Sequence, residues 1–315
     1  MKIKSKLAKV MEITVHLHLK LSQPMKVAGF TFVRNAQKYD YPIVEAITSI
    51  LPICDYFVVA VGDSEDETLA LIQSIPSDKI KIIETVWDDS LREGGRVLAV
   101  ETDKAFQAIP DDYDWAFYIQ GDEVVHENDL PTIKKAMEDN LNRTKVDGLL
   151  FKYRHFFGSY DYIGSSMRWY PTEIRVVRNK KSIYSFRDAQ GFRKDNDKML
   201  NVVAIDAHIH HYGWVKDPRT MQAKQETFHK LWHDDNWLDE NIPKVEEFDY
   251  FQNIDTLEKF QGSHPAVMQA RIERVNWKFN YDISFNKEPL KQKFKRWLKK
   301  VGIDTSYQNF VQVKS

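Results

Sequence analysis

The sequence predicts an α/β fold, in which a mostly parallel sheet is flanked by helices and followed by a mixed α/β second half. Between residues 25 and 139, short β-branched segments alternate with segments of helical periodicity. Four strands separated by helix-length segments are typical of right-handed βαβ units and a parallel sheet. After Asp147, glycines and polar loops separate further strands, and the chain ends in a charged, helical tail.

The predicted elements follow one another in a regular order. Strands are expected at 26–34, 56–61, 79–87 and 115–120, and helices at 42–50, 65–75, 96–109 and 130–140. In the second half, strands are expected at 148–157, 173–178 and 202–209, an aromatic-rich helix at 217–237 and a basic helix at 290–303. We expect an N-terminal extension at 1–24, one main domain at 25–245 and a helical appendage at 246–315.

Composition excludes several classes of protein. The 45 Lys and Arg nearly balance 46 Asp and Glu, and this net charge of −1 argues against a nucleic-acid partner. The single cysteine, Cys54, cannot form a disulfide within the chain, which fits a reducing compartment, and its apolar surroundings predict a buried side chain. No apolar run approaches the ~20 residues of a membrane span. The first 24 residues are basic, but His16, His18 and Lys20 interrupt their apolar stretch, which argues against a signal peptide.

Acidic residues follow the second and fourth predicted strands, at the edge where parallel sheets bind ligands. The first turn, Val61 to Thr68, carries Asp63 and Asp66, which can hold a base or a ribose or can simply cap the next helix. The second, Gln120-Gly121-Asp122-Glu123, offers adjacent carboxylates to Mg²⁺ or Mn²⁺, or is a solvated acidic turn.

Three histidines lie in the segment Asp206 to Trp214. In a strand, His208 and His210 share one face and His211 points to the other. One interpretation is a histidine that binds a metal or donates to a diphosphate. The alternative is a polar strand edge with satisfied histidines.

In this order the segments resemble family 2 glycosyltransferases, which have a Rossmann-like GT-A fold. The matching residues are Phe32-Val33-Arg34-Asn35 after the first strand, then Ser64, Asp66 and Thr68, the glycine-rich Arg92 to Arg96, and Gln120-Gly121-Asp122. The match has good order from residue 25 to 139 and is looser to about Lys224. Two positions depart from the family pattern: Gly62-Asp63 stands where an acidic pair is usual, and Gln120 stands at the first Asp of the metal motif.

The resemblance implies transfer of a sugar from a nucleoside-diphosphate donor (UDP or similar) to a hydroxyl of a glycan or lipid-linked acceptor in cell-envelope or surface glycan synthesis. It implies an inverting displacement assisted by Mg²⁺ or Mn²⁺, bound by Asp122, Glu123 and His211. The general base is expected to be Asp188, with Glu173 as runner-up. The residues expected to bind the nucleotide are Arg34, Asn35, Asp63, Asp66, Arg92, Arg96, Gln120, Arg175 and Arg178, although strand arginines are as often structural ion-pair partners.

Two other functions stay open. A GT-A-fold nucleotidyltransferase also uses carboxylates and a metal, but its basic, glycine-rich loop is replaced here by Asn35-Ala36-Gln37-Lys38, which has no glycine. A non-catalytic carbohydrate- or nucleotide-binding protein is compatible with Gln120 in the metal motif.

The basic helix at 290–303 suggests where the protein works. Its apolar residues fall at helical spacing on one face, and these are Leu290, Phe294, Trp297, Leu298 and Val301. Lysines and Arg296 cover the rest, with no acidic residue. Such helices lie in the membrane interface, so one interpretation is a cytoplasmic enzyme docked on the inner face of the membrane. The alternative is a helix that packs its apolar stripe on the main domain.

Overall fold

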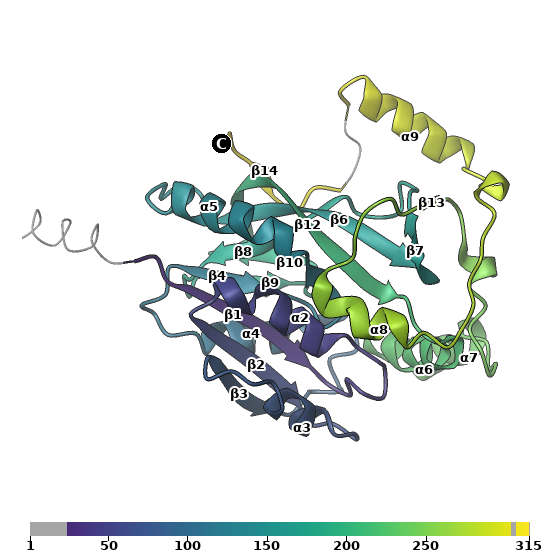
Figure 1. The fold of residues 1–315 in the computed structure, drawn as a ribbon, viewed down its shortest axis with the longest axis horizontal. Coiled ribbons are helices and arrows are strands. Elements are labelled where there is room, and N and C mark those ends of the chain that lie inside the picture. The colour runs from purple at the N-terminus through teal and green to yellow at the C-terminus, as the bar shows by residue number, and fades with distance from the viewer. Residues whose placement is uncertain (1–23, 304–306, 315) are drawn as a thin grey trace, which may run out of the picture.

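A large, curled mixed sheet of eleven strands forms the centre of the protein (Figure 1). The structure, a computed structural model, describes residues 24–303 and 307–314, so the expected extension at 1–24 lies almost entirely outside the described residues. Four parallel strands form its N-terminal part in the order β3 (Ile80–Thr85), β2 (Tyr56–Gly62), β1 (Val27–Val33) and β4 (Trp115–Tyr118). This confirms the predicted α/β fold and the four predicted strands.

The second half continues the sheet with strands of mixed direction. Antiparallel to β4 runs β8 (Thr172–Arg178), followed by β6 (Gly148–Phe157), β7 (Ser159–Gly164) and β13 (Leu257–Lys259). On the other side of β6 lies the long β12 (Asn201–Trp214), which also pairs with β5 (Glu123–Val125) and β14 (Val311–Gln312). A separate small sheet contains β9 (Ile183–Phe186), β10 (Gly191–Lys194) and β11 (Lys198–Met199).

Helices cover both faces of the parallel part because successive strand residues point to opposite faces. Trp115 and Phe117 of β4 pack in one cluster with α2 (Ile43–Ile50), α3 (Thr68–Gln73) and α5 (Leu130–Asn140). Ala116 and Tyr118 pack in the opposite cluster with α4 (Arg96–Gln107) and the small sheet. Cys54 is buried, as predicted.

Several boundaries differ from the sequence-based expectation. Helix α3 begins only at Thr68, because the Asp66 carboxylate accepts the Thr68 N–H (3.0 Å) and holds the preceding residues in a turn. Strand β12 runs beyond its predicted end because 209–211 pair with β5. The helix expected at 217–237 is divided into α6 (Pro218–Phe228), η3 (His229–Leu231) and α7 (Asp235–Asn241), and Asp234 caps α7 by accepting the Trp237 N–H (2.9 Å).

The C-terminal segment from residue 246 is only partly helical, because it adds β13 and β14 to the main sheet. Its helices are α8 (Gln269–Glu273) and α9 (Leu290–Lys300). Short 3₁₀ turns occur elsewhere at Leu51–Ile53, Glu127–Asp129, Phe251–Asn253, Ala266–Met268 and Ile283–Phe285. No helix in the described ranges is long and apolar enough to cross a membrane.

A fully buried ion pair joins β8 to the turn after β4. Arg175 donates from Nε and Nη2 to the two carboxylate oxygens of Glu123 (2.8 and 2.7 Å). Tyr153 Oη (2.6 Å) and the Gln120 N–H (3.1 Å) complete the set of donors to Glu123. The Arg175 guanidinium lies between the rings of Tyr118 and Tyr153, 5.2 and 5.3 Å from their centroids. The pair therefore locks together three strands and the turn at residues 120–123.

We predict that Glu123→Gln destabilises the protein strongly, because it leaves the buried Arg175 charge without its partner. Breaking a buried pair on one side costs about 3–5 kcal/mol. Urea unfolding of the variant should show a loss of this size. Asp139→Asn, which breaks an exposed pair with Lys135, is the control and should cost less than about 1 kcal/mol. Equal effects of the two substitutions would contradict a structural role for Glu123.

Candidate active site

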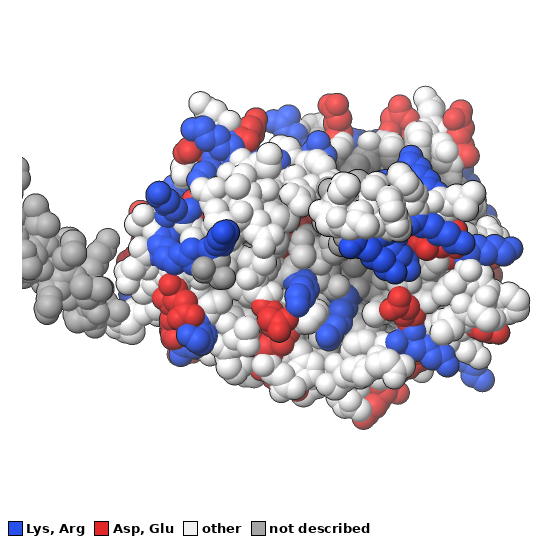
Figure 2. Space-filling view, turned by 90° about the horizontal axis from the view of Figure 1, so that it is seen from above, with Lys and Arg blue, Asp and Glu red and all other residues white. Residues whose placement is uncertain are grey.

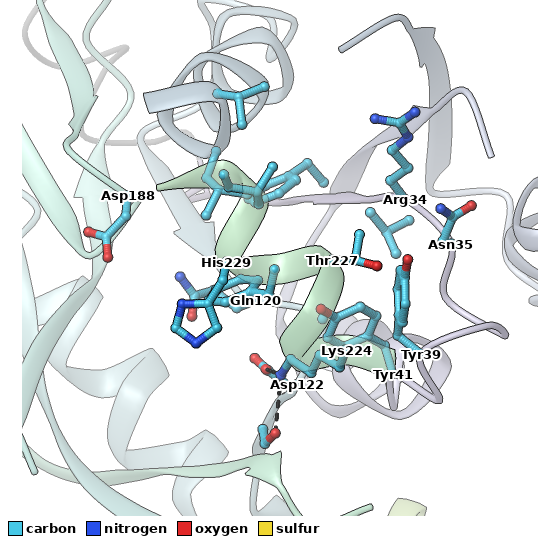
Figure 3. Close-up of a pocket in the computed structure, with 18 of the residues that line it drawn as sticks. Arg34, Asn35, Tyr39, Tyr41, Gln120, Asp122, Asp188, Lys224, Thr227 and His229 are labelled. Carbon is cyan, nitrogen blue, oxygen red and sulfur yellow. Dashed lines mark hydrogen bonds and ion pairs between the residues drawn. The ribbon is translucent and has the colours of Figure 1, made fainter. Parts of the chain in front are cut away.

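A cleft of about 860 Å³ opens at the carboxyl ends of β1 and β4. These two strands are neighbours in the sheet. The strands that follow β1 in the chain, β2 and β3, lie on one side of this pair, and β8, which follows β4 in the chain, lies on the other side. Open α/β sheets bind ligands at such a reversal of strand order. In Figure 3, Arg34 and Asn35 lie on one side of the cleft and Asp188 on the other, while Asp122, Gln120 and side chains of α6 and η3 lie between them.

The centre of the cleft contains Asp122, His211 and Lys224. Lys224 Nζ donates to Asp122 Oδ2 (3.3 Å) and to the Gly213 carbonyl (3.1 Å). On the other side of the carboxylate, His211 Nε2 lies 3.7 Å from Asp122 Oδ1. Burial by itself would raise the pKa of Asp122, but neighbouring cations, Lys224 first, outweigh it and lower this pKa to about 2. Asp122 is therefore a carboxylate at every physiological pH.

A chain of hydrogen bonds through His155 determines which nitrogen of His211 faces Asp122. The Tyr170 carbonyl can only accept, so His155 Nε2 carries the hydrogen that it donates over 2.8 Å. An imidazolium at His155, which is 2% exposed, would be a buried charge, and burial lowers the pKa of His155 to about 3. His155 Nδ1 therefore accepts a hydrogen from His211 Nδ1 (3.1 Å).

The His211 Nε2 atom then carries a lone pair that faces an ionised carboxylate, because burial also lowers the pKa of His211. Two electron-rich atoms that face each other across 3.7 Å are suited to share a cation. The neighbouring residue leaves room for it: a Cβ at Gly213 would lie 2.7 Å from both Asp122 Oδ2 and His211 Nε2. Asp122 and His211 thus fit a divalent ion as a pair of ligands.

Further protein ligands for such an ion are scarce. Within 24–303 and 307–314, no cluster of three or more His, Cys, Asp and Glu residues has metal-binding geometry. Glu123, the other expected ligand, is occupied by Arg175 and Tyr153. Mg²⁺ and Mn²⁺ often take only one or two protein carboxylates and complete their shell with substrate phosphates and water, so two protein ligands are sufficient when a diphosphate is bound.

Asp188 lies in the wall of the cleft formed by the turn between β9 and β10. Its neighbours Arg187 and Ala189 have φ angles of 57° and 62°, which non-glycine residues rarely adopt and which are frequent at functional sites. Asp188 Oδ1 is buried without a hydrogen-bond partner among the described residues, and burial raises its pKa. The Ala189 carbonyl accepts from Gln120 Nε2 (3.2 Å), which ties this turn to the end of β4.

The opposite end of the cleft is formed by the residues that follow β1 and β3. Arg34 donates to the Asp63 carbonyl (2.8 Å) and to Asp89 Oδ1 (3.0 Å), and its guanidinium lies 5.5 Å from the Trp87 ring centroid. Asn35 has a φ of 55° and accepts the Glu65 N–H (2.8 Å). Arg34, Asn35 and Trp87 thus form a polar and aromatic corner of the cleft, opposite Asp188.

The structure brings together about half of the residues predicted for the site. Those that line the cleft are Arg34, Asn35, Arg92, Gln120, Asp122, Arg175, Asp188 and His211. Asp63, Asp66, Arg96, Glu123, Glu173 and Arg178 lie outside its lining. Asp66 accepts the N–H groups of Lys38 (2.8 Å) and Thr68 (3.0 Å), which corresponds to the capping alternative.

Arg178 and Glu173 lie outside the cleft for different reasons. Arg178 pairs with Trp115 at the start of β4, the edge of the sheet away from the cleft, and donates to the Val146 carbonyl (3.1 Å). Glu173 lies on β8, and its side chain is buried beside Gly191 of β10. Among the other histidines, His210 packs in an aromatic cluster behind β12, and the His208 N–H donates to Asp129 (2.8 Å).

The sequence motifs did not reveal Lys224 and His155 as members of the site. Lys224 lies on α6, where a lysine at helical spacing looks like any surface residue. His155 lies on β6, paired with His211 in the parallel register between β6 and β12. The sequence did contain one signal, because Tyr153 and His155 are two residues apart and therefore share one face of the strand. Only the strand pairing shows that this face borders the cleft.

Comparison with known proteins yields only distant similarities. No family model matches the chain, and no curated protein matches it. Among solved structures, S. aureus TarS is similar with a TM-score of 0.36 and 15% identity, over 64% of this chain and 39% of TarS. Glucosyl-3-phosphoglycerate synthase from Mycobacterium tuberculosis, in complex with Mn²⁺, UDP and phosphoglyceric acid, has a TM-score of 0.29 and 17% identity over 42% of this chain and 43% of its own.

A third similar structure is 4-diphosphocytidyl-2C-methyl-D-erythritol synthase from Anaerococcus prevotii, with a TM-score of 0.35 and 10% identity over 65% of this chain and 95% of its own. The chain spans less than half the length of TarS and of the mycobacterial synthase. A functional assignment therefore has to rest on the cleft itself.

We predict that His155→Phe weakens Mn²⁺ binding about 10–100-fold, the usual effect of removing a partner that orients a metal-binding histidine. Phenylalanine keeps the stacking on Trp169 but cannot accept the His211 hydrogen. His155→Asn offers an acceptor oxygen near the Nδ1 position and should lose much less. Mn²⁺ affinity is measured by EPR with a nucleoside diphosphate present, and the His211 tautomer by ¹⁵N chemical shifts. Equal losses in the two variants, with an unchanged tautomer, would contradict this role of His155.

We predict that Glu173 makes the protein less stable as the pH rises. Burial raises the pKa of Glu173 to about 8 in the folded chain, against about 4.3 when unfolded. Between these two pH values the folded state binds a proton that the unfolded state does not bind. The free energy of unfolding therefore falls as the pH rises, and this loss is complete once the pH has passed about 8. In urea unfolding at pH 5 and pH 8, Glu173→Gln should reduce the pH dependence, while Glu258→Gln on the exposed side of β13 should not. An unchanged pH dependence in Glu173→Gln would refute the assignment.

Proposed function

We propose that the protein is a GT-A-type glycosyltransferase, resembling family 2, that moves a sugar from a nucleoside-diphosphate donor to a hydroxyl acceptor. One observation carries this proposal: Asp122, His211 and Lys224 meet in the centre of a large cleft, and the far wall of this cleft contains Asp188, whose buried Oδ1 has no hydrogen-bond partner among the described residues. The cleft thus combines a centre for binding a diphosphate with a separate proton acceptor.

The donor is proposed to lie across the cleft, with its nucleoside toward Arg34, Asn35 and Trp87 and its diphosphate at the centre. The Lys224 side chain is 10% exposed and its ammonium already lies next to Asp122, so it can donate to a phosphate oxygen without leaving its position. Trp87 offers a ring face on which a base can stack. The proposed UDP donor follows from the resemblance in the sequence.

Asp122 and His211 would hold an Mg²⁺ or Mn²⁺ ion, which supplies neutralisation of the charge that develops on the leaving diphosphate. The protein's own cation for that charge is Lys224. The proposed reaction is a single inverting displacement: the bond from the anomeric carbon to the diphosphate oxygen breaks as a bond to the acceptor oxygen forms.

Asp188 is proposed to accept the proton of the acceptor hydroxyl. Its carboxylate is free of hydrogen bonds at Oδ1, and its raised pKa makes it a better base than an exposed aspartate. Glu173, the other candidate, is outside the cleft and is largely protonated at neutral pH, since its pKa is raised to about 8. The carboxylate of Asp188 therefore fits this role better.

The acceptor is proposed to enter beside the aromatic wall formed by Trp169, Tyr170 and Trp214, all of which line the cleft. Aromatic faces suit the apolar faces of sugar rings, which supports a glycan or lipid-linked glycan as acceptor. A role in envelope or surface glycan synthesis, in the cytoplasm and at a membrane surface, is part of this proposal.

Calorimetry with a panel of nucleoside-diphosphate sugars, with and without Mn²⁺, tests the function. We expect one donor to bind, and Asp188→Asn to bind it within about twofold of the wild-type Kd while turnover falls about 10²–10⁴-fold. The matched control is Asp195→Asn, another aspartate of the small-sheet region, which has a φ of 51° and does not line the cleft. The control should keep both binding and turnover.

Other outcomes discriminate among the alternatives. Binding of no nucleotide sugar under either condition would refute the transferase. Release of pyrophosphate from a nucleoside triphosphate would indicate a nucleotidyltransferase. Binding of a donor by the wild type without turnover, across a range of acceptors, would indicate a non-catalytic binding protein.

A further inference from the structure

Helix α9 exposes the apolar side chains that an ordinary surface helix would bury. Leu290, Phe294, Trp297 and Val301 in this segment are 83%, 59%, 56% and 54% exposed. The rings of Phe294 and Trp297 stack on each other with centroids 5.9 Å apart, so they form one continuous apolar surface. Figure 1 shows α9 at the periphery, clear of the central sheet. The apolar stripe is therefore not packed on the main domain.

The hydrogen bonds and the ion pair that hold α9 come from another side of the helix. Arg296 donates to the Ser165 carbonyl (3.1 Å) and pairs with Glu288 (2.9 Å). Gln292 accepts the Met167 N–H (3.3 Å). The loop held in this way continues directly into Trp169 and Tyr170 in the wall of the cleft. The helix is thus attached to an element of the proposed acceptor side.

Charge determines what can cover the apolar stripe. Residues 290–303 contain no acidic residue, and their six basic residues are Lys291, Lys293, Lys295, Arg296, Lys299 and Lys300. Figure 2 looks down on the side of the molecule where α9 lies and shows Lys and Arg side chains bordering uncharged surface in that part of the view. A partner that covers α9 must therefore be apolar where it meets the stripe and negatively charged where it meets the basic residues.

Two other occupants are disfavoured by the same charges. A second copy, packed symmetrically through α9, would bring these cations against themselves. The N-terminal segment 1–23 is also basic, with five lysines and the single acidic residue Glu12. An anionic bilayer has both required properties, because its headgroups attract basic residues and its interface accepts Trp and Phe.

We propose that α9 docks the protein on the surface of an anionic lipid bilayer, with Phe294 and Trp297 inserted at the interface and the lysines against the headgroups. The docking stands on the exposure and charge of α9 alone and does not require the proposed chemistry of the cleft. Together with the transferase, it would hold the acceptor wall of the cleft close to lipid-linked substrates.

Flotation of the full chain with vesicles tests the proposal. We expect binding to vesicles that contain phosphatidylglycerol and none to pure phosphatidylcholine vesicles, and we expect this binding to weaken as salt shortens the Debye length. Phe294→Ser/Trp297→Ser should reduce the partition coefficient at least tenfold. Lys291→Gln/Lys293→Gln should reduce it about 25-fold, since each basic residue near an anionic surface contributes about 1 kcal/mol, or about fivefold.

Matched controls are taken from exposed positions elsewhere. Val245→Ser, at an apolar side chain that is 49% exposed, and Lys134→Gln/Lys278→Gln should bind as the wild type does. Absence of binding to anionic vesicles at low salt would overturn the proposal, and so would wild-type binding by Phe294→Ser/Trp297→Ser. Self-association of the wild type that is lost in Phe294→Ser/Trp297→Ser, without vesicle binding, would show that a second copy covers α9 instead. Donor binding is measured in parallel, so that failure to dock is distinguished from failure of the transferase proposal.

Discussion

The buried pair of Arg175 and Glu123 is the interaction on which the geometry of the cleft depends. Glu123 accepts hydrogen bonds from Arg175, Tyr153 and the backbone of Gln120, so the turn after β4 is held from three directions. Because this turn is fixed, the adjacent Asp122 is presented to the cleft between His211 and Lys224. Removing the two charges of a buried ion pair from water costs free energy. Here the same pair also fixes the position of the neighbouring Asp122 carboxylate.

The histidines of the cleft are also held in position by buried hydrogen bonds. His211 can offer a lone pair to the cleft only because its other nitrogen has a partner, and that partner, His155, is oriented in turn by the Tyr170 carbonyl. Tyr170 and Trp169 belong to the loop that also holds α9 through Ser165 and Met167. The proposed metal ligand, the proposed acceptor wall and the proposed membrane helix are therefore successive parts of one connected region.

Left-handed backbone angles also occur in the opposite wall of the cleft, around Asp188. Arg187 and Ala189 adopt left-handed backbone angles on both sides of Asp188, and Gly95 leaves room for that turn, since a Cβ there would lie 2.7 Å from the Asp188 Cβ. The turn is supported by Gln120, which donates a hydrogen bond to the Ala189 carbonyl. An aspartate at position 120 would have no hydrogen to donate to that carbonyl.

The sequence alone determined the α/β class, the four parallel strands and the position of Asp122 at the carboxyl end of a strand, because periodicity and strand order are local properties of the chain. Asp188 and His211 were predicted through the resemblance to a family, and the structure places both of them in the lining of the cleft. The sequence could not distinguish Asp122 from Glu123, since adjacent residues of a turn carry the same chemistry and only packing decides which one meets Arg175. Nor could it separate Arg175 from Arg178. On β8 they lie three residues apart, about 10 Å along the strand, and the antiparallel pairing of β8 with β4 carries Arg178 to the edge away from the cleft. His155 and Lys224 joined the site only through contacts between distant segments, which no local pattern encodes.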